Sequence, residues 1–193
     1  MADKVTRYLA LSQISLFSCL AICTIITPGL LFERNEGGVS NFGVHRATVV
    51  PYTLAFLLCG LFVLRAARDL PRTTKSFSHL RYGLYALAAV LFINLTTTYP
   101  YKSSQTLNNL HVTAAIIAFW VEMAMGVWLA LALYRDRLSI LLLALQAAGF
   151  FAAFLTFIGA VHLLFITQIV TALAFGGLLV HGVSRSINNS KLW

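Results

Sequence analysis

The stretch "HVTAAIIAFWVEMAMGVWLALALY", residues 111–134, decides the fold class of this protein. It contains 24 residues, no lysine or arginine, and a single acidic side chain, that of Glu122. A helix needs about 20 mainly apolar residues to cross the hydrocarbon core of a bilayer, which is about 30 Å thick. We therefore predict that residues 111–134 form a membrane-spanning helix.

The rest of the chain has the same character. Of its 193 residues, 59% are hydrophobic and 10% are charged, whereas a soluble domain carries roughly 25% charged residues. Six apolar runs are long enough to cross a bilayer, at about 8–32, 48–67, 82–99, 111–134, 138–158 and 161–183. No connection between them is long enough to hold a soluble domain. We expect an all-α integral membrane protein in which residues 1–193 form one six-helix transmembrane domain.

Lysine and arginine predict how this domain is oriented. With six spans both termini lie on one side, which then carries eleven of the 14 Lys and Arg residues; the other side carries Arg34, Arg46 and Lys102. Cytoplasmic loops are enriched in these residues, so the N- and C-termini are predicted to be cytoplasmic. The net charge of +8 suits anionic lipids at the inner face, and no nucleic acid partner is needed to explain it. A bacterial plasma (inner) membrane fits this multi-pass pattern.

The predicted outer loop, residues 33–47, is the most polar connection. Gly37-Gly38 and Ser40-Asn41 are turn formers, whereas Phe42 is too apolar to remain in water. The loop is therefore expected to fold back over the bundle as a lid, or as a plug that stabilises its outer end. Its candidate site residues are Glu36, Ser40, Asn41 and Gly43.

One face of the span 111–134 is predicted to pack inside the bundle. His111, Ala115 and Glu122 lie close together on a helix with 100° per residue, and Ile116 and Trp120 lie on the opposite side. Small side chains allow helices to approach closely in a membrane. We therefore expect the face with Glu122 to be internal and the bulky face to meet lipid.

Glu122 lies near the middle of the predicted membrane, about 16 Å from His111 at 1.5 Å per residue. An ionised carboxylate there is costly, so the side chain is expected to be protonated or tightly paired. It either forms a proton- or cation-binding site or makes a structural hydrogen bond between helices. The candidate partners, chosen for similar depth, are Asn94, Gln146, Gln168 and Thr171.

Three histidines form a second candidate site. His45, His111 and His162 lie at or just before the outer ends of spans two, four and six. Together they could hold a zinc ion with an open fourth position, or two of them could hold a haem. No H-x-x-x-H or H-E-x-x-H spacing connects them, and on a regular helix Gln168 and Thr171 lie roughly opposite His162. We therefore predict no cofactor and keep zinc or haem as the alternative.

The layout and two short motifs resemble the DRAM/Sfk-type membrane proteins, and equally a related bacterial six-span domain of unknown function. The motifs are the S-x-x-G element from Ser40 to Gly43 and the segment "NLHVTAAIIAF", residues 109–119. The resemblance implies that the Ser40 loop and His111 are characteristic positions, and it implies no catalytic mechanism. A ceramidase-like zinc hydrolase is less similar, because that group has seven spans and an intramembrane aspartate.

Three functions are consistent with the sequence. The leading interpretation is non-enzymatic: a transporter-like protein that binds or moves a small or lipidic ligand, with Glu122 as its buried ionisable group. The second is a metal-dependent lipid hydrolase at the membrane interface, or a haem protein, that uses the three histidines. The third is a structural subunit of a homo- or hetero-oligomeric membrane complex.

Overall fold

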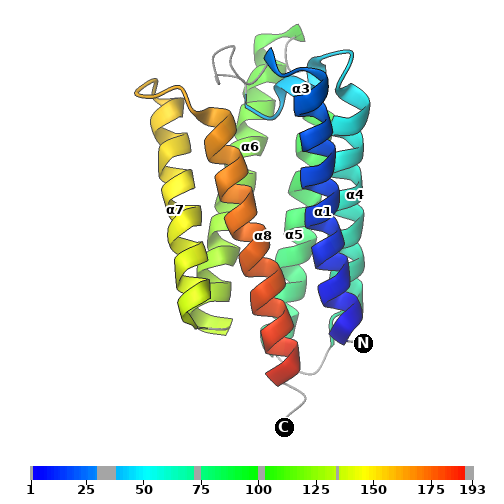
Figure 1. Ribbon diagram of the computed structural model, residues 1–193, viewed down its shortest axis with the longest axis vertical. Coiled ribbons are helices and arrows are strands. Elements are labelled where there is room, and N and C mark those ends of the chain that lie inside the picture. The colour runs from blue at the N-terminus through cyan, green and yellow to red at the C-terminus, as the bar shows by residue number, and fades with distance from the viewer. Residues whose placement is uncertain (1, 30–37, 72–74, 100–102, 134, 190–193) are drawn as a thin grey trace.

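A computed structural model describes residues 2–29, 38–71, 75–99, 103–133 and 135–189 of the chain (Figure 1). This part of the protein consists of helices and connections and contains no strand. The long helices are α1 (Ala2–Ile26), α4 (Val49–Asp69), α5 (Lys75–Thr98), α6 (Gln105–Trp128), α7 (Arg137–Phe157) and α8 (Leu164–Asn189). A short helix, α3 (Asn41–Val44), precedes α4, and a π-helical turn, η2 (Leu129–Leu133), continues α6.

Each of the six long helices is long and apolar enough to cross a membrane. The predicted all-helical class is therefore confirmed, and the described residues contain six helices of the length and composition predicted for the spans. Five boundaries differ from the predicted ones by more than one helical turn, two of them being the start of α6 at Gln105 instead of residue 111 and the end of α8 at Asn189 instead of residue 183. The first helix begins at Ala2 instead of residue 8 and ends at Ile26 instead of residue 32, since Pro28 cannot continue a helix. The third begins at Lys75 instead of residue 82.

The early start of α5 has a local cause in Arg81. Its guanidinium donates from Nε to the carbonyl of Ala67 (3.1 Å) and from Nη2 to the carbonyls of Leu70 (2.6 Å) and Pro71 (3.1 Å). The last carbonyls of a helix have no donor within that helix, and a cation at this end is favourable. Arg81 therefore closes the end of α4 from within α5, so the polar residues before position 82 belong to the helix.

The start of α1 and the end of α8 lie at the same end of the bundle, which we call the terminal end (Figure 1). α3 lies at the opposite end, called the α3 end below. α1 packs along α4 and also contacts α8, α5 lies between α4 and α6, and α7 packs mainly on α8. Consecutive long helices therefore run in alternating directions between the two ends.

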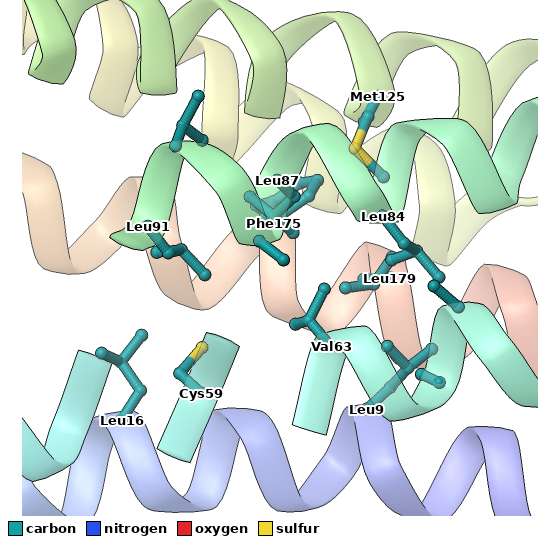
Figure 2. Close-up of a cluster of buried hydrophobic side chains, with 14 of the residues drawn as sticks. Leu9, Leu16, Cys59, Val63, Leu84, Leu87, Leu91, Met125, Phe175 and Leu179 are labelled. Carbon is teal, nitrogen blue, oxygen red and sulfur yellow. The ribbon is translucent and has the colours of Figure 1, made fainter. Parts of the chain in front are cut away.

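The hydrophobic core is built by five of the six long helices. Figure 2 shows Leu9, Val63, Leu84, Met125 and Leu179 meeting from α1, α4, α5, α6 and α8. No described residue of α7 belongs to this cluster. α7 is a peripheral helix, and its position beside α6 leaves space at the α3 end.

Candidate functional site

The described part of the predicted lid begins at Gly38, which has a φ of +57°. A Cβ at this position would lie 2.4 Å from Oε1 of Gln168, so the backbone can approach α8 only because the residue is glycine. The next residue, Val39, donates its N–H to the same Oε1 at 2.7 Å. The segment is thereby attached to α8.

The rest of the segment packs on α4, α5 and the start of α8. The Phe42 side chain is buried and meets the ring of Phe165 edge to face, with 5.8 Å between centroids. Thr48 donates its hydroxyl to the Phe42 carbonyl at 2.7 Å. A Cβ on Gly43 would lie 2.4 Å from a Thr98 methyl group. Residues 38–44 therefore lie tightly against the bundle, whereas Glu36 of the predicted lid lies outside the described residues.

His111 joins this segment to α5 and α6. Its Nε2 lies 2.9 Å from Oγ of Ser40, and its Nδ1 lies 3.2 Å from Oγ1 of Thr97. The imidazole is buried, with 6% of the residue exposed. The sequence singled out Ser40 and His111 separately; Thr97, the third member, has no distinguishing pattern in the sequence.

A cavity of about 650 Å³ opens beside this pair, between α6, α7 and the start of α8. Its wall along the helices is apolar and includes Ile116, Phe119, Trp120, Phe150 and Phe154. Polar side chains also line it: Ser40, Asn108, His111, Thr156, His162 and Gln168. All six belong to the α3 end of their helices or to the connections there, so the cavity has one polar end and an apolar body.

Aromatic rings join α6 to α7 in the apolar part of this cavity. The ring centroid of Phe150 lies 5.2 Å from that of Trp120 and 5.9 Å from that of Phe119, both in edge-to-face geometry. Trp120 follows His111 by nine residues, which corresponds to about 14 Å along a helix. These rings therefore mark the depth to which the cavity extends.

His111 is buried, as expected for its face of α6, whereas Ile116 and Trp120 of the opposite face are 41% and 60% exposed and line the cavity together with His111. Glu122 is half-buried and is not among the residues that line the cavity. Within the described part of the chain, its carboxyl group forms no hydrogen bond.

The predicted partners of Glu122 do not gather around its carboxyl group. Gln146 donates to the backbone carbonyl of Glu122 at 2.9 Å. Asn94 donates to Ala114 at 3.3 Å, eight residues before Glu122 and thus about 12 Å away along α6. Gln168 binds Val39, and Thr171 packs against Gly149. Equal depth in the membrane did not identify the partners of Glu122, because depth does not determine how each helix is rotated about its axis.

The three predicted metal-binding histidines do not converge either. His111 and His162 line the cavity, whereas His45 is exposed at the end of α3 and does not. Among the described residues, no three His, Cys, Asp or Glu side chains are placed to hold a metal ion. His162 nevertheless shares the cavity with Gln168, contrary to the expectation of opposite faces. The reason is that α8 begins at Leu164, so His162 belongs to the preceding connection.

Asn108 is a lining residue that the sequence analysis missed. It precedes His111 by three positions, and residues three apart lie on the same side of a helix, so helical spacing was a usable signal. The aromatic residues of α7 had no such signal, because apolar residues are spread around most of the α7 surface.

Comparison of the chain with models of protein families, with curated proteins and with solved structures finds no match.

Proposed function

We propose that this protein binds an amphipathic lipid with one hydrocarbon chain in the cavity between α6, α7 and α8. The observation that carries the proposal is the division of the cavity into an apolar body and one polar end. Ligand sites are mainly apolar, with a few polar groups that set the orientation of the ligand. An amphipathic molecule satisfies both parts only when its polar end lies beside Ser40 and His111.

The dimensions support a hydrocarbon chain as the occupant. The distance from His111 to Trp120, about 14 Å along α6, is close to the hydrocarbon thickness of one leaflet, about 15 Å. Burying an apolar chain contributes about 0.8 kcal/mol per CH₂ group relative to water. Transfer of the chain from the bilayer releases less free energy than transfer from water. Selectivity for one lipid therefore has to come from the polar end and from the shape of the aromatic wall.

The position of the cavity supports entry from the bilayer. Ile116, Trp120 and Phe154 line it and are 41%, 60% and 53% exposed, so the rest of the bundle does not cover this part of the wall. In a membrane these surfaces meet lipid chains, so a lipid can move sideways into the cavity without crossing water. With the termini in the cytoplasm, as the positive-inside rule predicts, the polar end lies in the outer leaflet.

The polar end suits an uncharged group of the ligand. Among the described residues that line the cavity, none is Lys, Arg, Asp or Glu. The polar groups at this end are the hydroxyl of Ser40, the amide of Asn108 and the imidazole of His162. An ester, amide or alcohol matches these partners, whereas a doubly charged phosphate would meet no cationic side chain among the described lining residues.

The experiment is photocrosslinking of the protein in lipid nanodiscs with a monoacylglycerol that carries a diazirine in its chain. We expect saturable labelling of α6 and α7 that excess unlabelled monoacylglycerol suppresses. Ala115, which lines the cavity, is replaced by phenylalanine to fill it. The matched control is Ala124→Phe, an exposed position of the same helix that does not line the cavity.

Labelling should be lost in Ala115→Phe and retained in Ala124→Phe, with both variants folded as judged by thermal unfolding. Labelling that does not saturate, or that is equal in the two variants, would contradict the proposal. That result would favour the structural interpretation, in which the chain is only a subunit that packs against other membrane helices.

A further inference from the structure

We propose that Ser40 and His111 form a nucleophile–base pair that cleaves the carboxylic ester of an amphipathic lipid. The inference rests on the proposed lipid site and adds a reaction to it. A serine hydroxyl becomes a useful nucleophile when a base lies within hydrogen-bonding distance and a third group orients that base. Ser40, His111 and Thr97 have this arrangement, with distances of 2.9 Å and 3.2 Å.

The hydrogen bonds of Thr97 determine which nitrogen of His111 is protonated. Oγ1 of Thr97 lies 2.9 Å from the carbonyl oxygen of Ile93 and 3.2 Å from that of Asn94. Carbonyl oxygens only accept, so the Thr97 hydroxyl donates to one of them and accepts the N–H of Nδ1. Nε2 then carries a lone pair that points at Ser40 and accepts its hydroxyl proton. This is the tautomer that a general base requires.

The pair is held rigidly and is reachable from the cavity. His111 is 6% exposed, and Ser40 belongs to a segment that Gly38 and Phe42 attach to the bundle. Both Ser40 and His111 line the cavity. Reactive groups placed on rigid elements keep the geometry that the reaction needs, and the ester of a bound lipid lies next to Oγ of Ser40.

Two amide side chains can stabilise the negative charge that develops on the ester oxygen. Gln168 accepts the N–H of Val39 with its Oε1, which leaves its NH₂ group as a donor. The side-chain amide of Asn108 lies one turn before His111 and also lines the cavity. Preorganised donors of this kind stabilise the tetrahedral intermediate of acyl transfer.

The reaction needs water as its only co-reactant. Oγ of Ser40 attacks the ester carbon while Nε2 of His111 takes the hydroxyl proton. The tetrahedral intermediate collapses, the bond to the alcohol oxygen breaks, and His111 returns the proton to the alcohol. Water then attacks the acyl-serine with His111 again as base, and a carboxylic acid and free Ser40 are formed.

The same hydrogen bond could serve only to hold the loop on α6, so the test has to measure reactivity. A long-chain alkyl fluorophosphonate reacts with an activated serine, whose Oγ displaces fluoride from phosphorus. We expect the wild-type protein in nanodiscs to be labelled at Ser40, as identified by peptide mass spectrometry. The labelling rate should rise with pH as the imidazole loses its proton.

Three variants separate catalysis from structure. Ser40→Ala should lose the label, and Ser103→Ala, at the same end of the bundle and outside the cavity, should keep it. His111→Gln can keep a hydrogen bond to Ser40 but is no base, so its labelling rate should fall at least about 100-fold, the lower limit for general-base catalysis. No labelling of the wild type, labelling at another residue, or unchanged labelling of His111→Gln would overturn the inference.

Photocrosslinking of the same samples distinguishes the two proposals. Wild-type protein that binds the diazirine lipid saturably but does not react with the fluorophosphonate retains the binding function and disproves the reaction. Protein that neither binds the lipid nor reacts disproves both. Monoacylglycerol hydrolysis by the wild type, lost in Ser40→Ala and His111→Gln, is the direct confirmation.

Discussion

Nε2 of His111 lies 2.9 Å from Oγ of Ser40, although the two residues are 71 positions apart in the chain. Their contact joins α6 to the segment that precedes α4, at the polar end of the cavity. The hydroxyl of Thr97 lies on the other side of the imidazole. α5 therefore orients the imidazole, and the segment before α4 brings the hydroxyl to it.

Thr97→Val should slow the reaction of Ser40 with the fluorophosphonate. Valine has a similar shape but cannot accept the N–H of Nδ1, so the imidazole loses the group that holds its tautomer. Loss of one hydrogen bond of about 1.4 kcal/mol corresponds to a tenfold change, and we expect about a tenfold lower rate. Thr96→Val, an exposed neighbour, is the control; equal rates in both variants would show that Thr97 does not position His111.

Gly38→Ala should destabilise the attachment of the segment to α8. Alanine at a φ of +57° costs about 1 kcal/mol, and its Cβ would in addition displace the Gln168 amide. The midpoint of thermal unfolding in nanodiscs measures the effect. Gly159→Ala, with φ +78° and open space around its Cβ, measures the cost of the backbone conformation alone. Gly29→Ala, also in open space, should leave the midpoint of thermal unfolding unchanged. If the unfolding midpoint falls no further in Gly38→Ala than in Gly159→Ala, the contact with Gln168 is contradicted.

Asp136 should make the stability of the terminal end depend on pH. Its Oδ2 accepts a hydrogen bond from Nε2 of His181 at 2.7 Å, and its Oδ1 accepts the N–H of Ser139 at the start of α7. The hydrogen bond from His181, followed by that from the Ser139 backbone, lowers the pKa of Asp136 from 3.8 to about 2. A carboxyl group with a lowered pKa stabilises the fold fully above its ordinary value and loses this contribution as the pH falls.

We therefore expect the unfolding midpoint to decrease between about pH 4 and pH 2, in part through Asp136. Asp136→Asn keeps an N-cap side chain but has no titrating group at this position. The difference in midpoint between the two proteins should shrink as the pH is lowered through this range. A constant difference would mean that the hydrogen bond from His181 does not favour the ionised form.

Glu122→Gln should leave lipid binding unchanged. Glu122 does not line the cavity, and glutamine has nearly the same shape. Saturable photocrosslinking of the diazirine lipid measures the result, with Ala115→Phe as the variant that loses binding. Loss of labelling in a folded Glu122→Gln protein would restore Glu122 to the binding site and return the proton-coupled interpretation to first place.

Individual elements explain how much of the fold could be predicted from the sequence. The six spans were predictable because a bilayer forces each backbone polar group to bond within its own helix, which requires about 20 consecutive apolar residues. The start of α5 was not, because Lys75 and its polar neighbours are helical through the contact of Arg81 with the end of α4. Hydropathy indicates whether a residue prefers water or lipid. It does not indicate which group elsewhere in the fold forms its hydrogen bonds.

The candidate site divides in the same way. Ser40, His111 and Gln168 were singled out from the sequence because polar residues in an apolar chain are conspicuous. Their grouping was predicted wrongly: Gln168 was assigned to Glu122, and His111 to a set of three histidines. The structure places Gln168 and His111 at one cavity with Ser40 and leaves Glu122 and His45 outside it.

The sequence by itself determined the helical class and the six helices long and apolar enough to cross a membrane, because these depend on the apolar residues along one segment. Only the tertiary structure decided that Ser40 meets His111, that Thr97 orients it, and that α7 stands far enough from α6 to leave a cavity. Those contacts depend on how each helix is rotated and spaced against its neighbours. Rotation and spacing result from the packing of side chains from several helices at once, which no single segment of the chain encodes.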